Sequence, residues 1–180
     1  MTYYHCSPVH GLRILEPAKP RCFDKSAAVY LTASLPMALM YGVHNFEYTY
    51  GYTREGPIYY EEYFPGALEE IYRGKRASLY FCELNTVTTT AIPNEVVSTE
   101  AVAVAKEIEI PDVLEALLEQ ERLGNLRIRR FEELSPQMLD WIKKAEAEEI
   151  RKRGLIRSGG PMAEYMCKHY PASWELAMEG

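Results

Sequence analysis

The chain has 180 residues, of which 47% are hydrophobic and 26% charged, and its formal net charge is −6. This composition is ordinary for a globular protein of one domain, or of one domain with a helical appendage. The acidic balance argues against a protein that neutralises many nucleic-acid phosphates. The sequence shows no basic-then-apolar leader and no apolar run of membrane-spanning length, so we expect a cytoplasmic protein without a membrane partner.

The first predicted elements are short strands followed by a helix. Thr2 to His5 is apolar and β-favouring, and another short strand is expected at 12–15. A buried strand over Ser26 to Thr32 leads directly into a helix from Leu35 to Tyr41, with Ser34 as its N-cap. Side chains at strand ends and strand-to-helix junctions can point together into a crevice.

A tyrosine-rich segment comes next. The alternation of Phe46 to Tyr50 predicts one arm of a β-hairpin, with Gly51 near its turn. Two interpretations stay open: the tyrosines cover the core with their hydroxyls in water, or they form an aromatic flap beside a ligand site. The seven tyrosines are Tyr41, Tyr48, Tyr50, Tyr52, Tyr59, Tyr60 and Tyr63.

The rest of the chain alternates between helices and strands. Strands are predicted at 77–84, 96–97, 102–110 and 126–131, and helices at 65–74, 112–123 and 136–153. Beyond Gly154 the motif Gly159-Gly160-Pro161 breaks the chain, so at most one more short helix is expected. We therefore predict an α+β domain over residues 1–132 and a helical C-terminal extension over residues 133–180, packed on the same domain.

Cysteine and histidine spacing gives little sign of a metal site. The sequence has no Cys-x-x-Cys pair, and its histidines add no metal-ligand spacing, so we expect no bound metal. Free thiols explain the scattered cysteines better than a disulfide framework does. They are Cys6, Cys22, Cys82 and Cys167.

Three short motifs near the N-terminus resemble a known family. His5-x-Ser7, then Val29-Tyr30-x-Thr32, then a helix ending in Ala38-x-x-Tyr41 is similar to the ADP-ribosyltransferase fold. The resemblance is to the branch of diphtheria toxin and the poly(ADP-ribose) polymerases, known by a His-Tyr-Glu triad. Tyr41 follows Tyr30 at a spacing similar to that of the family's second, ring-stacking tyrosine. The resemblance implies a split, mostly antiparallel β-sandwich with surrounding helices.

The family's third motif is an acidic residue that opens a late strand. Glu95, in Asn94-Glu95-Val96-Val97, fits this motif. Glu100 precedes the apolar run at Val102 equally well, and a register shifted by one residue turns every side chain to the other face. Glu95 is therefore the predicted acid, and Glu100 stays open as the alternative.

The resemblance implies a bacterial-type mono-ADP-ribosyltransferase, of the glycosyltransferase class, that uses NAD as its substrate. Breaking the nicotinamide–ribose bond develops positive charge on the sugar, which one well-placed carboxylate stabilises. By the resemblance Glu95 takes this role, and His5 holds a ribose hydroxyl. Tyr30 and Tyr41 would stack on the nicotinamide ring. Ser7 would add a hydrogen bond at the ribose or the phosphates.

Two positions depart from the family pattern. Cys6 stands where a glycine is usual, at the point where the backbone pairs with the nicotinamide amide, and its Cβ crowds that approach. Ala38 stands where a serine often supplies a hydroxyl to the same amide. A catalytically inactive protein that binds NAD, ADP-ribose or a partner is therefore the first alternative.

The second alternative is an RNA 2′-phosphotransferase on the same kind of fold. It would need a cluster of basic residues near His5 or Tyr30, which the sequence does not show. The acceptor of the ADP-ribose, whether protein, nucleic acid or small molecule, stays open, as does the oligomeric state.

Overall fold

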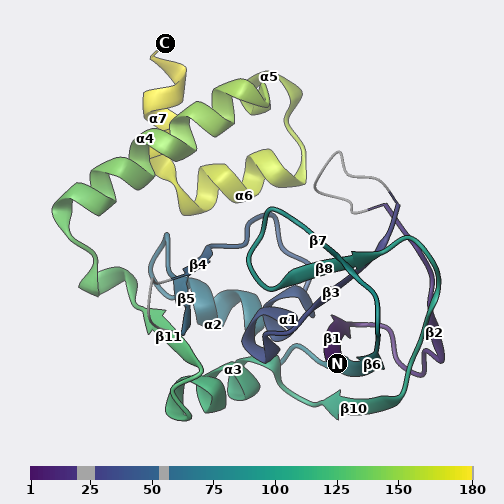
Figure 1. The fold of residues 1–180 in the computed structure, drawn as a ribbon. Coiled ribbons are helices and arrows are strands. Elements are labelled where there is room, and N and C mark those ends of the chain that lie inside the picture. The colour runs from purple at the N-terminus through teal and green to yellow at the C-terminus, as the bar shows by residue number, and fades with distance from the viewer. Residues whose placement is uncertain (20–26, 53–56, 180) are drawn as a thin grey trace. The chain divides into compact units, whose positions relative to one another are not determined.

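A computed structural model describes residues 1–19, 27–52 and 57–179 (Figure 1). These residues form a mixed α+β fold with a mostly antiparallel sheet, as the sequence predicts. Within them the chain divides into two compact units, the first made of Met1–Tyr60 and Leu68–Ile128, the second of Glu61–Ala67 and Arg129–Gly180. Two features of the sequence analysis, the start of a strand at Ser26 and the thiol of Cys22, lie outside the described residues.

The main sheet of the first unit runs through β10 (Lys106–Ile110), β6 (Ala77–Glu83), β1 (Thr2–Ser7), β3 (Val29–Thr32), β8 (Glu95–Ser98) and β7 (Thr88–Thr89), in that order. Tyr4 pairs with Thr32, and Thr32 pairs with Glu95. Residues directly opposite each other share a face, so these three side chains form a row across β1, β3 and β8.

The strands predicted for β1, β3, β6 and β8 are confirmed. The single strand predicted at 102–110 is wrong, because the chain forms β9 (Val102–Ala103) and then β10. β9 pairs with β2 (Ile14–Leu15), and Val104 still donates to the carbonyl of Arg13 at 3.0 Å. The next amide, that of Ala105, donates instead to Phe81 of β6 at 2.8 Å, so the backbone changes partner between these residues.

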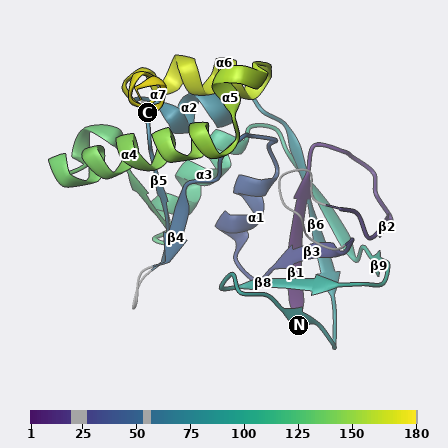
Figure 2. The same cartoon turned by 90° about the horizontal axis from the view of Figure 1, so that it is seen from above.

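Helix α1 (Leu35–Tyr41) confirms its predicted bounds. The Ser34 hydroxyl accepts from the amide of Met37, and a proline occupies the first turn, where its missing N–H costs nothing. α1 packs on β1, β3 and α3 (Val113–Arg122), as Figure 2 shows for the two strands. The face of the sheet beneath it carries Cys6 and Leu79, while the other face carries a separate apolar cluster.

The predicted hairpin exists, but its predicted arm is wrong. The strands are β4 (Tyr50–Tyr52) and β5 (Ile58–Glu61), and Gly51 lies within β4 opposite Tyr59. A Cβ on Gly51 would come within 2.4 Å of the Tyr59 hydroxyl, so this glycine makes room for a ring instead of forming a turn. β5 also neighbours β11 (Leu126–Arg129), and α2 (Ala67–Tyr72) follows β5 in the chain.

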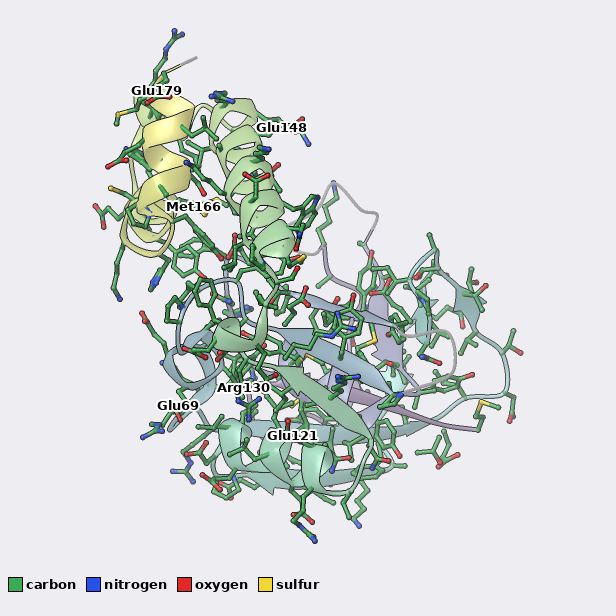
Figure 3. All side chains as sticks on the ribbon, turned by 90° about the vertical axis from the view of Figure 1, so that its left-hand side faces the viewer. Glu69, Glu121, Arg130, Glu148, Met166 and Glu179 are labelled. Carbon is green, nitrogen blue, oxygen red and sulfur yellow. The ribbon has the colours of Figure 1, made fainter. Side chains whose placement is uncertain are left out.

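The second unit holds more helix than predicted. α4 (Pro136–Lys152) has its predicted start and N-cap, Ser135. The expectation of at most one short helix after it is wrong: in the described residues α5 (Leu155–Ser158), α6 (Pro161–His169) and α7 (Pro171–Met178) follow. Pro161 and Pro171 start helices, since proline fits the first turn. In Figure 3 Glu148 and Glu179 point outward, while Met166 is fully buried in this unit.

No helix in the described part of the chain is both long and apolar enough to span a bilayer.

Candidate functional site

His5 is held by the strand next to it. Its Nδ1 lies 3.0 Å from the carbonyl oxygen of Tyr30, and a carbonyl can only accept, so Nδ1 carries the hydrogen. Burial lowers the pKa of His5 below its ordinary value, which keeps the ring neutral at neutral pH. Nε2 therefore presents a lone pair, and His5 can accept a hydrogen bond from a ligand hydroxyl.

Glu95 opens β8 and is only 6% exposed. It lies opposite Thr32 of β3, and its Oε1 accepts from the hydroxyl of Thr90 at 2.8 Å. Glu100 lies beyond the end of β8 in an exposed turn, whose geometry is fixed by bonds of 2.9 and 3.2 Å between Ser98 and the Glu100 backbone. Of the two candidate acids, Glu95 is thus the buried one beside β3.

A row of tyrosine rings lies near Glu95. The hydroxyls of Tyr41 and Tyr50 are 2.7 Å apart, and the Tyr50 and Tyr52 rings meet edge to face at 6.1 Å. The ring of Tyr41 lies 4.8 Å from that of Tyr48. Burial raises the pKa of Tyr41, of Tyr50 and, to about 12, of Tyr52, and the negative charge of Glu95 adds to each shift. Tyr41, Tyr50 and Tyr52 are therefore neutral phenols, and the hydrogen of Tyr52 is already donated to the carbonyl of Pro93.

The predicted residues fall into two groups. By the two-residue period of β3, Tyr30 shares a face with Thr32, and therefore with Glu95. His5 follows Tyr4, so regular alternation assigns it to the opposite face, where its ring lies 6.3 Å from that of Tyr80. The two groups are joined by the hydrogen bond from His5 to the Tyr30 carbonyl.

The side chains of Cys6 and Ala38 are part of the core. They are 5% and 2% exposed, and burial raises the pKa of the Cys6 thiol to about 12, so it is not a nucleophile at neutral pH. Only the backbone of Cys6 remains to contact a ligand. The Ser7 hydroxyl accepts from the amide of Val9 at 3.2 Å and keeps its own hydrogen to donate.

Sequence reasoning missed Thr90 and Tyr52. Thr90 lies in a threonine-rich segment between two predicted strands, and Tyr52 is one of seven tyrosines in its region. Tyr52 donates to the carbonyl of Pro93 at 2.7 Å, two residues before Glu95. No local pattern marks these residues, because the Tyr52 contact joins segments 41 residues apart and the contact of Thr90 with Glu95 exists only in the folded turn.

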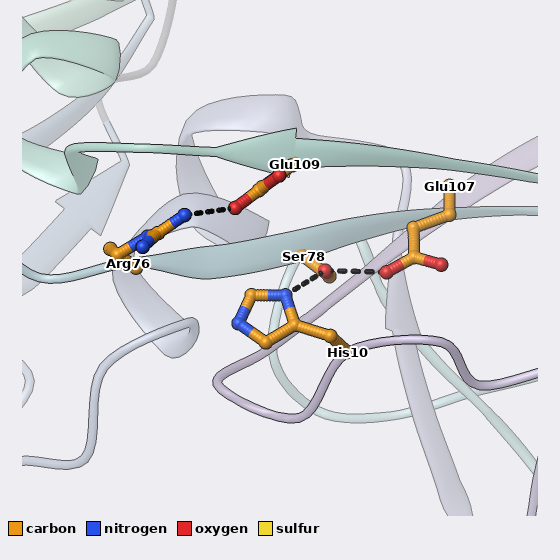
Figure 4. Close-up of polar contacts among 5 residues, drawn as sticks. All are labelled: His10, Arg76, Ser78, Glu107 and Glu109. Carbon is orange, nitrogen blue, oxygen red and sulfur yellow. Dashed lines mark hydrogen bonds and ion pairs between the residues drawn. The ribbon is translucent and has the colours of Figure 1, made fainter.

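A second polar cluster consists of His10, Ser78 and Glu107 (Figure 4). By the pairing of β1, β6 and β10, Ser78 and Glu107 lie on the face of the sheet that carries His5, opposite to that of Glu95. The Ser78 hydroxyl donates to Glu107 Oε1 at 2.6 Å, and His10 Nδ1 therefore donates to Ser78 at 2.7 Å. The amide of Gly11 donates to the same carboxylate oxygen at 3.0 Å. Ser78 is fully buried, so this cluster ties the segment after β1 to β6 and β10 and exposes no nucleophile.

The described residues contain no group of three or more His, Cys, Asp or Glu side chains that could hold a metal ion. Comparison with family models, with curated proteins and with solved structures finds no match to this chain. The resemblance therefore rests on the motif residues, and the geometry around Glu95 and His5 bears on what these residues could do together.

Proposed function

We propose that the chain is an NAD-dependent mono-ADP-ribosyltransferase with the split sandwich of that fold, and that the ionised side chain of Glu95 is its catalytic carboxylate. The observation that carries the proposal is the placement of Glu95. A buried carboxylate opens β8 opposite Thr32 of β3, the strand that bears Tyr30, and its negative charge helps to raise the pKa of Tyr41 and of Tyr50.

The proposed chemistry uses fixed charge. As the nicotinamide–ribose bond breaks, and before an acceptor nucleophile or water bonds to the anomeric carbon, positive charge grows on the ribose. The Glu95 carboxylate stabilises that charge more than it stabilises the substrate. Nicotinamide departs as a neutral base, so no general acid is required. Tyr30 and Tyr41 offer ring faces to nicotinamide. The neutral ring of His5 accepts a ribose hydroxyl through Nε2.

The proposal sets a condition on how NAD lies. His5 is on β1 and Glu95 is on β8, with β3 between them. Alternation also assigns the two side chains to opposite faces of the sheet, so a dinucleotide held by both must pass around the end of β3. Substitution of either residue should then impair the same reaction.

Release of nicotinamide from NAD tests the activity. We expect wild-type protein to release it, and Glu95→Gln to lower kcat by at least about 10²-fold, because the charge that stabilises the transition state is lost. Glu100→Gln is the matched control, since it makes the same chemical change in an exposed turn. Full activity in Glu95→Gln, or loss only in Glu100→Gln, would reject the assignment.

A second candidate is an NAD or ADP-ribose binder without turnover. The buried side chains of Cys6 and Ala38 offer no polar group to the nicotinamide amide, and this observation favours it. Titration calorimetry with NAD and, separately, with ADP-ribose distinguishes the two functions. Heat of binding without released nicotinamide would support the binder, and no heat with either ligand and no released nicotinamide would reject both.

A further inference from the structure

The hydroxyl of Thr90 has one hydrogen and two acceptors within reach. Glu95 Oε1 lies at 2.8 Å and the carbonyl oxygen of Ile92 at 3.4 Å. The shorter contact is also the one to a charged group, and hydrogen bonds to carboxylates are stronger than neutral ones. The hydrogen of Thr90 therefore goes to Glu95.

The same hydroxyl is itself held in place. Its oxygen accepts from the amide of Ile92 at 3.1 Å, so donor and acceptor directions are both used. The backbone closes around it, because the amide of Glu95 donates to the carbonyl of Ile92 at 3.1 Å and the amide of Thr90 donates to the carbonyl of Glu95 at 3.3 Å. The turn between β7 and β8 thus presents one oriented hydroxyl to the carboxylate.

Hydrogen bonds from residues outside the turn also hold it in place. Asn94 has a φ of +63°, a left-handed conformation that asparagine tolerates better than most residues. Its carbonyl accepts from the amide of Ala33 at 3.1 Å, and the Tyr52 hydroxyl of β4 donates to the preceding carbonyl, that of Pro93, at 2.7 Å. Neighbouring segments on two sides thereby hold the residue that precedes Glu95.

We propose that Thr90 is a positioning residue that fixes the Glu95 carboxylate in one orientation, an inference that rests on the proposed function of Glu95. The last torsion of a glutamate side chain is broad, so burial alone does not aim its oxygens. Charge stabilisation in a transition state depends on groups that are already aimed before the reaction begins. The Thr90 hydrogen bond supplies that aim without touching the substrate.

Two readouts on Thr90→Val and Thr90→Ser test the proposal. Valine keeps the branched shape and loses the hydroxyl, while serine keeps the hydroxyl. We expect Thr90→Val to lower kcat for nicotinamide release by roughly 10-fold with little change in KM, because orientation is lost but not binding. Thr90→Ser should restore most of the rate. Thr89→Val is the matched control, since Thr89 is exposed on β7.

The second readout does not depend on activity. Crystal structures of wild type and both variants should show one defined orientation of the Glu95 carboxylate in wild type and Thr90→Ser, and a different or disordered orientation in Thr90→Val, because the bond that aims the carboxylate is removed. A carboxylate that keeps its orientation in Thr90→Val, or equal effects of valine and serine, would overturn the positioning role. Wild-type protein that releases no nicotinamide would overturn the proposed function alone, because the crystal structures show the Thr90–Glu95 bond without any turnover.

Discussion

Two features of the structure keep the imidazole of His5 in one neutral tautomer. Its Nδ1–H is committed to the Tyr30 carbonyl, and the burial of the ring disfavours a second proton. A neutral ring with a directed lone pair is suited to accept a hydroxyl, and a charged ring is not. The same burial makes the protonation of His5 a measurable part of folding stability.

We expect His5 to make the protein less stable in mild acid. Burial lowers its pKa from 6.5, partly opposed by the bond to Tyr30, so below that pH the unfolded chain binds a proton that the folded chain does not. The stability that His5 contributes is complete above pH 6.5 and declines as the pH falls toward the folded pKa. His5→Asn keeps an N–H donor and removes the titration.

Urea unfolding followed by far-UV circular dichroism, repeated between about pH 7.5 and about pH 5, measures this effect. Wild-type protein should lose stability relative to His5→Asn as the pH falls. A stability difference that stays constant over this range would contradict a buried, neutral His5.

At the scale of elements, α1 and β1 contact each other through Cys6, which stands where the ADP-ribosyltransferase pattern usually has glycine. Cys6 projects toward α1, and Gly42, which follows the helix, has no side chain. A Cβ built on Gly42 would come within 2.5 Å of the Cys6 sulfur. The thiol therefore occupies space that the glycine leaves open, and the two residues fit each other.

Gly42→Ala should destabilise the protein by roughly 1–3 kcal/mol, the usual cost of overpacking, even though alanine favours helix. Cys6→Ala removes the nearest obstacle, so the double variant should lose less than the sum of the two single losses. Contacts to Leu39 at 3.1 Å and Ala77 at 3.3 Å remain, and the rescue is therefore partial. A thermodynamic double-mutant cycle measures the coupling, and strict additivity would contradict the contact.

The predicted bounds of helices and strands are right where neighbouring residues set them and wrong where packing contacts set them. α1 and α4 start at the predicted residues because Ser34 and Ser135 cap them and a proline lies in the first turn of each. β4 is centred on residue 51, three residues beyond the centre of the expected arm, because Gly51 lies within the hairpin opposite Tyr59 and leaves room for its ring. Pro161 was interpreted as a break, yet it starts α6.

The residues of the candidate site also divide into those that short motifs predict and those that only folded contacts identify. His5, Tyr30 and Glu95 could be proposed from short motifs, since each lies on or opens a strand that its own neighbours predict. Thr90 and Tyr52 could not, because their roles arise from hydrogen bonds to Glu95 and Pro93 that depend on the folded turn. Residues that act through such hydrogen bonds can be identified only from the folded structure.

At the scale of the whole molecule, the second unit is not a simple C-terminal extension. Besides Arg129–Gly180 it includes Glu61–Ala67, which comes from the middle of the sequence. Within this unit Arg129 pairs with Glu61 at 3.0 Å. Phe64 is 4% exposed and stacks on His169 at 4.1 Å. A boundary drawn at residue 132 would therefore separate residues that pack together.

We expect Phe64→Ala to destabilise the second unit by roughly 3–5 kcal/mol, because it empties a buried aromatic contact. Both tryptophans, Trp141 and Trp174, lie in this unit, so tryptophan fluorescence during urea unfolding reports on it. Phe46→Ala is the matched control, since Phe46 is 43% exposed in the first unit and its loss should not move the fluorescence transition. Equal transitions in wild type and Phe64→Ala would mean that residues 61–67 do not belong to this unit, and the boundary expected from the sequence at 132 would then stand.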